Sequence, residues 1–283
     1  MDQRVAELYG CDTRDLRAAW PRVIGNAICP FLQKRCVKSR KSSPDLTIGT
    51  CTVEYGSERR LVMICPFRML EKRRVFTDAL HLLAAHEPGN DLHVVPEFSV
   101  PGGSIDYMLV SVRRDKPVDF VGIELQTLDT TGSVWPARER FCSAVGVATD
   151  KRAAVSKTTY GVNWKMSAKT ILVQMHHKLG TFEHVNRKLV LALQDDLLKY
   201  MRMAFRFDHL SSPPSAADAM HFHAYGLQDG GATLELVLAE RISTDDEGMA
   251  RALGLQAESN VDLEDILAGL GAKISDASRF TPA

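Results

Sequence analysis

The sequence of 283 residues lacks any long uninterrupted run of apolar residues, and its first twenty residues contain Asp, Arg and Glu. A membrane-spanning helix needs roughly 18 consecutive apolar residues, and a secretory leader needs an apolar segment near the N-terminus. The sequence therefore predicts a cytoplasmic protein with no membrane partner.

The sequence also lacks GxSxG, HExxH and P-loop motifs. These motifs are typical of serine hydrolases, zinc proteases and NTPases, so those three enzyme classes have no support. No repeat is present beyond the short stretch ICPF, which occurs at 28–31 and again at 64–67. A composition of 45% hydrophobic and 25% charged residues predicts an ordinary globular protein with a substantial core.

Neither sign of charge is in excess, because 35 Lys and Arg balance 35 Asp and Glu. Residues 1–74, however, carry 15 basic and 8 acidic side chains, whereas residues 228–283 carry 4 and 11. An anionic partner would meet the N-terminal part first, unless these Lys and Arg residues only solvate the surface. The acidic C-terminal region 228–283 is interpreted as solvated surface around short helices.

Hydrophobic periodicity predicts the order helix, three strands, helix, strand, helix between residues 69 and 203. This order indicates an α/β protein of the α+β type, in which helices lie beside a mixed sheet. We expect an N-terminal part at 1–68, helical over 1–25 and mostly irregular after it, with two strands. The predicted core spans 69–283, with a helix at 69–85, three strands within 92–126, an insert at 127–163, a helix around 163–179, a strand at 188–194 and a helix from 195.

Five of the six cysteines lie in the first quarter of the chain. In a reducing cytoplasm such clustering favours a metal site over disulfides. The spacings lack the tight C-x2-C pairs of zinc sites, so free buried thiols are the alternative. Two Cys-Pro turns that bracket two further thiols could close a four-sulfur site for zinc or iron, formed by Cys29, Cys36, Cys51 and Cys65.

Three polar side chains, Asp106, Glu124 and Gln126, interrupt the predicted strands. Because an unpaired carboxylate inside a sheet is costly, each acid needs a hydrogen bond, solvent or a ligand. Glu124 and Gln126 point to the same side of their strand, and strand pairing can bring Asp106 close to Glu124. Two carboxylates with the Leu125 carbonyl group form an all-oxygen ligand set suited to Mg²⁺. The alternative is that Glu124 and Gln126 are surface residues of an edge strand.

The spacing of Asp106 and Glu124-x-Gln126 is similar to the active site of PD-(D/E)xK nucleases, in which Lys usually takes the last place. The Gln, the stretches GGSIDY and IELQTLDTTG, and the cysteine cluster together resemble the NotI-type restriction endonucleases, over roughly residues 26–200. The resemblance implies a PD-(D/E)xK restriction-endonuclease-like fold with an N-terminal four-cysteine metal-binding module. Ile105 stands where PD-(D/E)xK nucleases have Pro.

The same resemblance implies a magnesium-dependent type II restriction endonuclease that cuts double-stranded DNA at a specific sequence, leaving 5′-phosphate and 3′-hydroxyl ends. It assigns Mg²⁺ to Asp106 and Glu124, places Gln126 in the Lys position, and assigns iron or zinc to the four cysteines. A palindromic target would require a homodimer, and a methyltransferase acting on the same site would be a companion. The alternatives are a non-catalytic DNA-binding or regulatory protein on the same fold, and a repair or mobile-element nuclease with little sequence preference.

Several other side chains are candidates for the same site. Glu97 is a further candidate ligand or a cap of the PGG turn at 101–103, and Glu71 competes with it. Lys165 and Lys169 could contribute the cation that Gln126 lacks, although a helix-surface role is expected for either alone.

The paired histidines and the basic residues complete the set of candidates. His176 with His177, and His221 with His223, are expected to be solvated or hydrogen-bonded rather than metal pairs. Candidate DNA contacts lie around Cys36 and in the insert, namely Lys34, Arg35, Lys38, Arg40, Lys41, Trp135, Arg138, Arg140, Lys151, Arg152 and Lys157.

Overall fold

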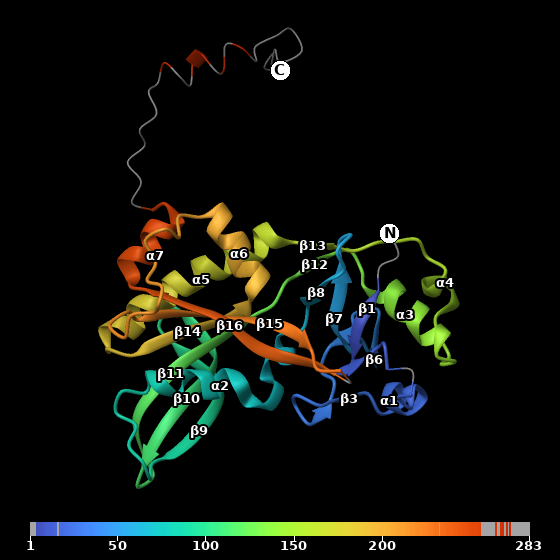
Figure 1. Cartoon of the computed structure of the whole chain (residues 1–283), viewed down its shortest axis with the longest axis horizontal. Helices are drawn as coiled ribbons and strands as arrows, with labels where there is room; N and C mark the ends of the chain where they lie inside the picture. The colour runs from blue at the N-terminus through green and yellow to red at the C-terminus, as the bar shows by residue number, and fades with distance from the viewer. Residues whose placement is uncertain are drawn as a thin grey trace, which may run out of the picture.

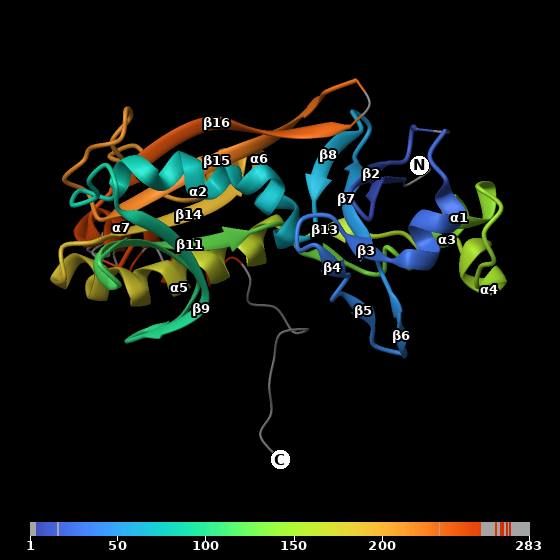
Figure 2. The same ribbon diagram turned by 90° about the horizontal axis from the view of Figure 1, so that it is seen from below.

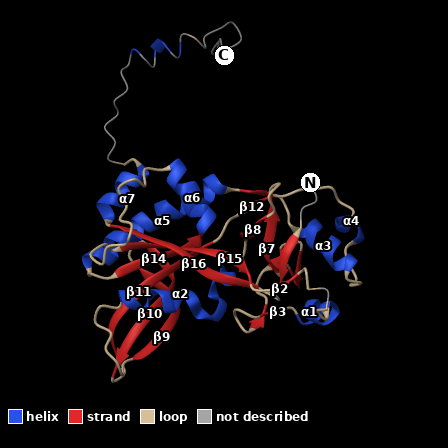
Figure 3. Cartoon of the chain, in the orientation of Figure 1, coloured by secondary structure: helices blue, strands red, loops and turns tan. Residues whose placement is uncertain are grey.

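The computed structural model describes residues 4–15, 17–231 and 233–255, together with 264, 267, 268, 270 and 272. Its main feature is a six-stranded mixed sheet with helices on both faces, next to a smaller four-stranded sheet built from the N-terminal part (Figures 1 and 3). The predicted mixed sheet of the α+β class is confirmed.

The large sheet has the strand order β16-β15-β14-β11-β10-β9. Strands β9, β10 and β11 form an antiparallel meander, β14 and β15 add in parallel to β11, and β16 returns antiparallel. The central strand β14 is apolar on both faces because helices cover both sides of it, and its bounds agree with the predicted strand. The strands are β9 (Asp91–Val100), β10 (Gly103–Arg113), β11 (Lys116–Gln126), β14 (Lys188–Gln194), β15 (Met220–Asp229) and β16 (Leu234–Thr244).

Helix α5 (Trp164–His184) connects β11 to β14 and covers one face of this sheet, together with α6 (Asp195–Ala204) and α7 (Asp246–Leu253). The opposite face is covered by the segment that precedes β9 (Figure 2). The helices expected around 163–179 and from 195 are confirmed by α5 and α6.

The single helix predicted over 69–85 is wrong. The segment consists of a 3-10 helix η1 (Pro66–Arg73), the helix α2 (Arg74–Ala79) and a 3-10 turn η2 (Leu80–Leu82). Lys72 and Arg73 have φ angles of 50° and 55°, which break the helix. The break lets the two segments point in different directions. Arg68 of η1 is buried, while α2 buries Val75, Phe76 and Ala79 in the cluster that contains residues of the large sheet.

The N-terminal part forms a small sheet of order β2-β1-β7-β8. The helix predicted over residues 1–25 is wrong for Val5–Leu8, which is a fully buried strand paired with β7, because strand pairing outweighs the local pattern. The two strands expected between 26 and 67 are confirmed as β7 and β8. The elements here are β1 (Val5–Leu8), β2 (Cys11–Asp12), α1 (Trp20–Asn26), β3 (Ile28–Cys29), β4 (Lys34–Arg35), β5 (Ser39–Arg40), β6 (Ser43–Thr47), β7 (Thr50–Tyr55) and β8 (Arg60–Met63).

The insert after β11 lies beside the small sheet, where Figure 1 shows α3 next to β1 and α4 beyond α3. One hydrophobic cluster includes Leu8 of β1, Cys142 of α3 and Leu172 of α5. The small sheet, the insert and the large sheet therefore share one core. The insert consists of β12 (Thr130–Thr131), α3 (Trp135–Ala144), α4 (Lys151–Ala154) and β13 (Gly161–Val162).

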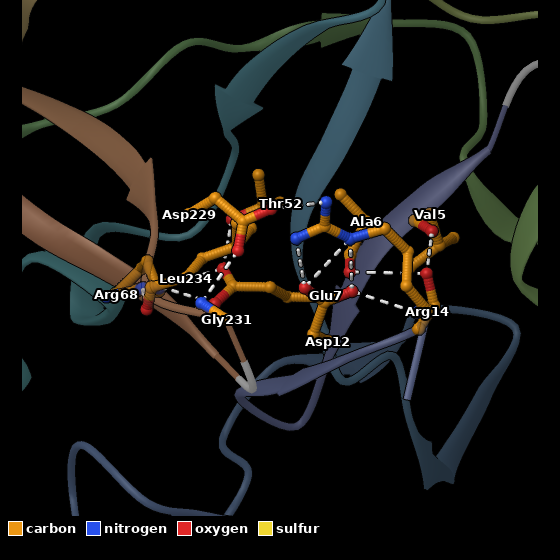
Figure 4. Close-up of polar contacts among 11 residues, drawn as sticks. Val5, Ala6, Glu7, Asp12, Arg14, Thr52, Arg68, Asp229, Gly231 and Leu234 are labelled. Carbon is orange, nitrogen blue, oxygen red and sulfur yellow. Dashed lines mark hydrogen bonds and ion pairs between the residues drawn. The ribbon is translucent and has the colours of Figure 1, made fainter. Parts of the chain in front are cut away.

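A buried ion pair joins the two sheets (Figure 4). Arg68 of η1 lies 2.7 Å from Glu7 Oε2 of β1, and each side chain is 1% exposed. Arg68 also donates to the Leu234 carbonyl oxygen of β16 at 2.7 Å, while Thr52 donates to Glu7. Every charge at this junction is thus paired within the protein, which is the condition under which buried ions are tolerated.

Within the part of the chain that the structure describes, no helix is both long enough and apolar enough to cross a membrane.

Candidate active site

The two acids predicted from the sequence lie on adjacent strands. Asp106 is near the start of β10 and Glu124 near the end of β11, and since Tyr107 pairs with Ile123 the two acids are next in register. Residues opposite each other in an antiparallel pair point to the same face. The Leu125 N–H donates to Asp106 Oδ2 at 2.9 Å, which ties the two strands at this point. The structure therefore brings Asp106 and Glu124 together.

Glu124 is only 5% exposed, and its ionisation is strongly affected by its surroundings. Burial raises the pKa of Glu124 to about 7, the hydrogen bond from Lys178 opposes this change, and the negative charge of Asp106 adds to it. A carboxyl group with a raised pKa beside a second acid is typical of functional sites, since structural acids are usually paired more completely.

Lys178 of α5 is the functional candidate that the sequence analysis missed. Its Nζ lies 2.6 Å from Glu124 Oε1 and 2.7 Å from the Ser104 carbonyl oxygen. The two lysines proposed from the sequence, Lys165 and Lys169, are exposed instead. The sequence does contain a sign of this role. Lys178 lies seven residues after the buried Ile171, on the side of α5 that otherwise carries apolar residues and faces the core.

The Pro-Gly-Gly turn between β9 and β10 holds this lysine in place. Gly102 has a φ of +94°, and a Cβ atom there would lie 2.3 Å from the His177 carbonyl oxygen. At Gly103 a Cβ atom would lie 3.1 Å from Lys178 Cε. Glycine is needed at 102 because the turn packs directly on the backbone of α5 at His177. This contact places Lys178, the next residue of α5, against the first residues of β10.

Glu97 and Gln126 flank the acid pair. Pro96 and Phe98 of β9 pair with Tyr107 and Ile105, so Glu97 falls opposite Asp106, although it has a left-handed φ of 53° and is exposed. Burial raises the pKa of Tyr107, and the charges of Asp106 and Glu97 add to the rise, so both acids lie near this ring.

Gln126 is half-buried at the end of β11. Its Nε2 donates to the Thr127 carbonyl oxygen, which leaves the amide oxygen as the group that can accept a hydrogen bond from a ligand. Glu71, the competitor of Glu97, belongs to the junction instead: it binds Arg68 at 3.1 Å and accepts from the Leu236 N–H at 2.6 Å.

The four cysteines proposed as metal ligands gather at the small sheet. Burial raises the pKa of Cys51 and of Cys65, and the neighbouring thiols contribute: Cys65 and Cys29 act on Cys51, and Cys29 and Cys36 act on Cys65. The Lys38 ammonium lowers the pKa of Cys65 in opposition to burial. All four are free thiols. Among the described residues, however, no three His, Cys, Asp or Glu side chains converge in the arrangement that holds a metal ion.

The structure places His221 and His223 in the buried part of β15. The Nε2 atom of His221 lies 3.0 Å from the Asp218 carbonyl oxygen, as expected for a hydrogen-bonded imidazole. Both nitrogens of His223 are buried without a hydrogen-bond partner, so the expectation of a solvated or hydrogen-bonded ring is wrong there. Burial lowers the pKa of His221 to about 4 and that of His223 to about 3, so both rings are neutral at pH 7.

The candidate DNA contacts fall into two groups. Some side chains make internal contacts: Lys38 donates to the Ile64 carbonyl oxygen at 2.6 Å, and Arg138 donates to that of Ile48 at 2.7 Å. Arg40 and Arg138 each place Cζ 4.6 Å from the centre of the Trp135 ring. The exposed candidates are Lys34, Arg35, Lys41, Lys151, Arg152 and Lys157, of which Arg35 donates to the Asp45 carbonyl oxygen at 2.9 Å.

No protein-family model matches this sequence, and no curated protein matches it at a significant level. The function is therefore inferred from the residues of the site.

Proposed function

We propose that this protein is a magnesium-dependent endonuclease of the type II restriction class, which hydrolyses phosphodiester bonds of double-stranded DNA to 5′-phosphate and 3′-hydroxyl ends. The observation that carries the proposal is the register of β10 and β11, which sets Asp106 beside Glu124 with Gln126 two residues further along the same strand.

The connectivity of the large sheet supports the proposal. A helical segment is followed by the meander β9-β10-β11, then by α5 as a crossover, and then by β14 in parallel with β11. This order of helix, three strands, helix and strand is the one predicted from the sequence, and α5 covers the face on which Glu124 lies. Because folds host many activities, the acids and not the fold carry the argument.

The acid pair has the chemistry of a magnesium site. Protein donors engage one oxygen each of Asp106 and Glu124, and a Mg²⁺ ion would be held by these two carboxylates together with the Leu125 carbonyl group. Bound Mg²⁺ lowers the pKa of a water molecule and neutralises phosphate charge. A divalent cation would also replace the proton that the buried Glu124 tends to hold near neutral pH.

Gln126 cannot act as a base, because an amide does not take a proton near neutral pH. Its amide oxygen can accept a hydrogen bond from the attacking water and so orient it toward phosphorus. As the water oxygen bonds to phosphorus, it releases a proton to solvent, the bond to the 3′ oxygen breaks, and the 3′ oxygen takes a proton from solvent. Glu97, opposite Asp106, is the remaining acid for the outer part of this site.

The cysteine cluster is proposed as a structural iron or zinc site formed by Cys29, Cys36, Cys51 and Cys65. The thiols lie close enough to affect one another's pKa, as ligands of one ion would, and the Lys38 ammonium lowers the pKa of Cys65 and so favours its thiolate. Such a site would fix the basic loops around β4 and β5. Elemental analysis of fresh, reduced protein should find about one iron or zinc per chain, retained in Cys142→Ser and lost in Cys51→Ser. Absence of both metals from the wild type would contradict the cysteine site and leave the acid pair unaffected.

Incubation of the purified protein with unmodified phage or plasmid DNA and Mg²⁺ tests the proposed activity. Discrete bands would support a sequence-specific restriction enzyme, for which a two-fold dimer and a protecting methyltransferase would follow. A smear would indicate a repair or mobile-element nuclease. Binding without any cutting would contradict catalysis and indicate a DNA-binding or regulatory protein.

A further inference from the structure

The strand that carries Glu124 and Gln126 brings no positive side chain to the acid pair. An amide cannot balance the charge that builds on a phosphate under attack, so a site with Gln126 needs a cation from another element. The structure shows such a cation on α5, where the Lys178 ammonium contacts Glu124 Oε1 at 2.6 Å.

The ammonium group of Lys178 has one N–H donor that is not used in a hydrogen bond within the protein. It carries three N–H groups, and the structure gives two of them acceptors, Glu124 Oε1 and the Ser104 carbonyl oxygen. Ser104 belongs to the exposed start of β10, directly after the glycines of the turn. The third N–H is therefore available to a ligand that approaches the acid pair at this edge of the sheet.

The position of Lys178 is fixed before any ligand arrives. On α5, Met175 and Phe182 are buried on the same side as Lys178 and anchor the helix on the sheet. On the other side, Gly102 packs on the His177 backbone, and Gly103 leaves room for the lysine side chain itself. A charge held in this way costs little reorganisation during reaction, which is the property of an effective electrostatic catalyst.

We propose that Lys178 is a catalytic residue that supplies the positive charge missing at Gln126, by donating its third N–H to a non-bridging oxygen of the scissile phosphate. This inference rests on the proposed endonuclease function. Lys178 transfers no proton in this step. The water oxygen forms the new bond to phosphorus and releases a proton to solvent, while the bond to the 3′ oxygen breaks and that oxygen takes a proton from solvent. The ammonium stabilises the negative charge on the phosphate oxygens during this change.

A purely structural role makes a different prediction. If Lys178 only held Glu124 in position, its loss would weaken binding of a divalent cation by the two acids. If Lys178 acts on the phosphate, its loss removes a positive charge from the neighbourhood of the cation. Cation binding would then stay as strong or become stronger, while turnover falls.

The test compares Lys178→Met, Lys178→Gln and Lys178→Arg with wild type, with Lys116→Met at the far, exposed end of β11 as the control. Binding of Mn²⁺ is measured from the electron paramagnetic resonance signal of the free ion, DNA binding is measured in Ca²⁺, and cleavage is measured in single-turnover reactions with Mg²⁺. We expect the Met and Gln variants to cut about 10²–10³-fold more slowly, with Mn²⁺ and DNA affinity not weaker than in wild type. The Arg variant should recover part of the rate because its charge is retained.

Three results would overturn the inference. Wild-type cutting rates in Lys178→Met would exclude a role in the reaction, and weakened Mn²⁺ binding in folded Lys178→Gln would assign the lysine a structural role. Lys178→Gln retains a hydrogen-bond donor, so it serves if the Met variant does not fold. The third result concerns the wild type: protein that binds Mn²⁺ and cuts no DNA would overturn the proposed function and this inference with it. The first two results, by contrast, are obtained with wild-type protein that does cut DNA, so they overturn the role of Lys178 alone.

Discussion

Two buried acid–base pairs, one at the junction of the sheets and one at the acid site, differ in how completely they are satisfied. At the junction, Arg68 donates to both Glu7 oxygens, to Glu71 and to the Leu234 carbonyl oxygen, and both members of the pair are 1% exposed. At the site, Lys178 and Glu124 have 8% and 7% exposed side chains, and a second acid, Asp106, lies beside them.

This difference suggests different roles: the Arg68–Glu7 pair stabilises the fold, and the Lys178–Glu124 pair belongs to a binding site. A buried pair with every donor and acceptor used is stable as it stands, and breaking it leaves an uncompensated charge. At the acid site, burial holds the pKa of Glu124 at about 7 although Lys178 contacts it, so the ionised carboxylate is incompletely stabilised, and a divalent cation such as Mg²⁺ would stabilise it further. Loss of the first pair should therefore affect folding, and loss of the second should affect activity.

The largest expected effect is on cleavage. Glu124→Gln and Asp106→Asn each remove a charged oxygen ligand, and we expect DNA cutting with Mg²⁺ to fall by about 10³-fold or more, because several kcal/mol of charge stabilisation are lost. DNA binding in Ca²⁺ should remain measurable. The control is Asp115→Asn at the exposed β10–β11 turn, which should cut at the wild-type rate. Normal turnover by either acid variant would remove that residue from the site.

The second effect is on folding. Arg68→Met leaves Glu7 buried without its partner, and urea unfolding should show a loss of about 3–5 kcal/mol in the free energy of unfolding. Arg113→Met breaks the surface pair with Glu87, in which the two side chains are 55% and 63% exposed, and should cost at most about 1 kcal/mol. Equal losses in the two variants would contradict the difference between buried and exposed pairs.

The third and smallest effect has opposite signs in the two regions. The pKa of Glu124 is raised to about 7 in the folded protein, so its ionisation costs stability as the pH rises from its ordinary value near 4.5 through 7. At pH 8 in EDTA, the double variant Glu124→Gln with Lys178→Met, which leaves neither buried charge without its partner, should therefore increase the free energy of unfolding, by about 3 kcal/mol. Glu7→Gln under the same conditions should decrease it. A less stable double variant would mean that this pair is structural.

Local patterns predicted β9, β10, β11 and β14 of the large sheet, because buried strands such as Lys188–Gln194 are continuous apolar runs. They did not predict β15 and β16, and the interpretation of the region from 228 as surface around short helices is wrong for β16. The same approach failed at Val5–Leu8, where pairing with a strand some 45 residues away decides the structure. It also failed over 69–85, because the break at Lys72 and Arg73 serves the burial of Arg68 against Glu7.

At the acid site, the chain spacing of Asp106 and Glu124 was enough to predict their proximity, since consecutive antiparallel strands have a simple register. Lys178 was missed because it comes from a helix 54 residues beyond Glu124, and only tertiary packing on the Gly102 turn brings it there. A lysine on the apolar side of a predicted helix is the sign that should be sought in such sequences.

The most direct test of the shared cation is an anomalous difference map from crystals of the protein soaked in Mn²⁺. Our account predicts one strong peak about 2 Å from a carboxylate oxygen of both Asp106 and Glu124. Manganese bound to other side chains, with these two carboxylates left without an ion in crystals of cleavage-competent protein, would contradict it.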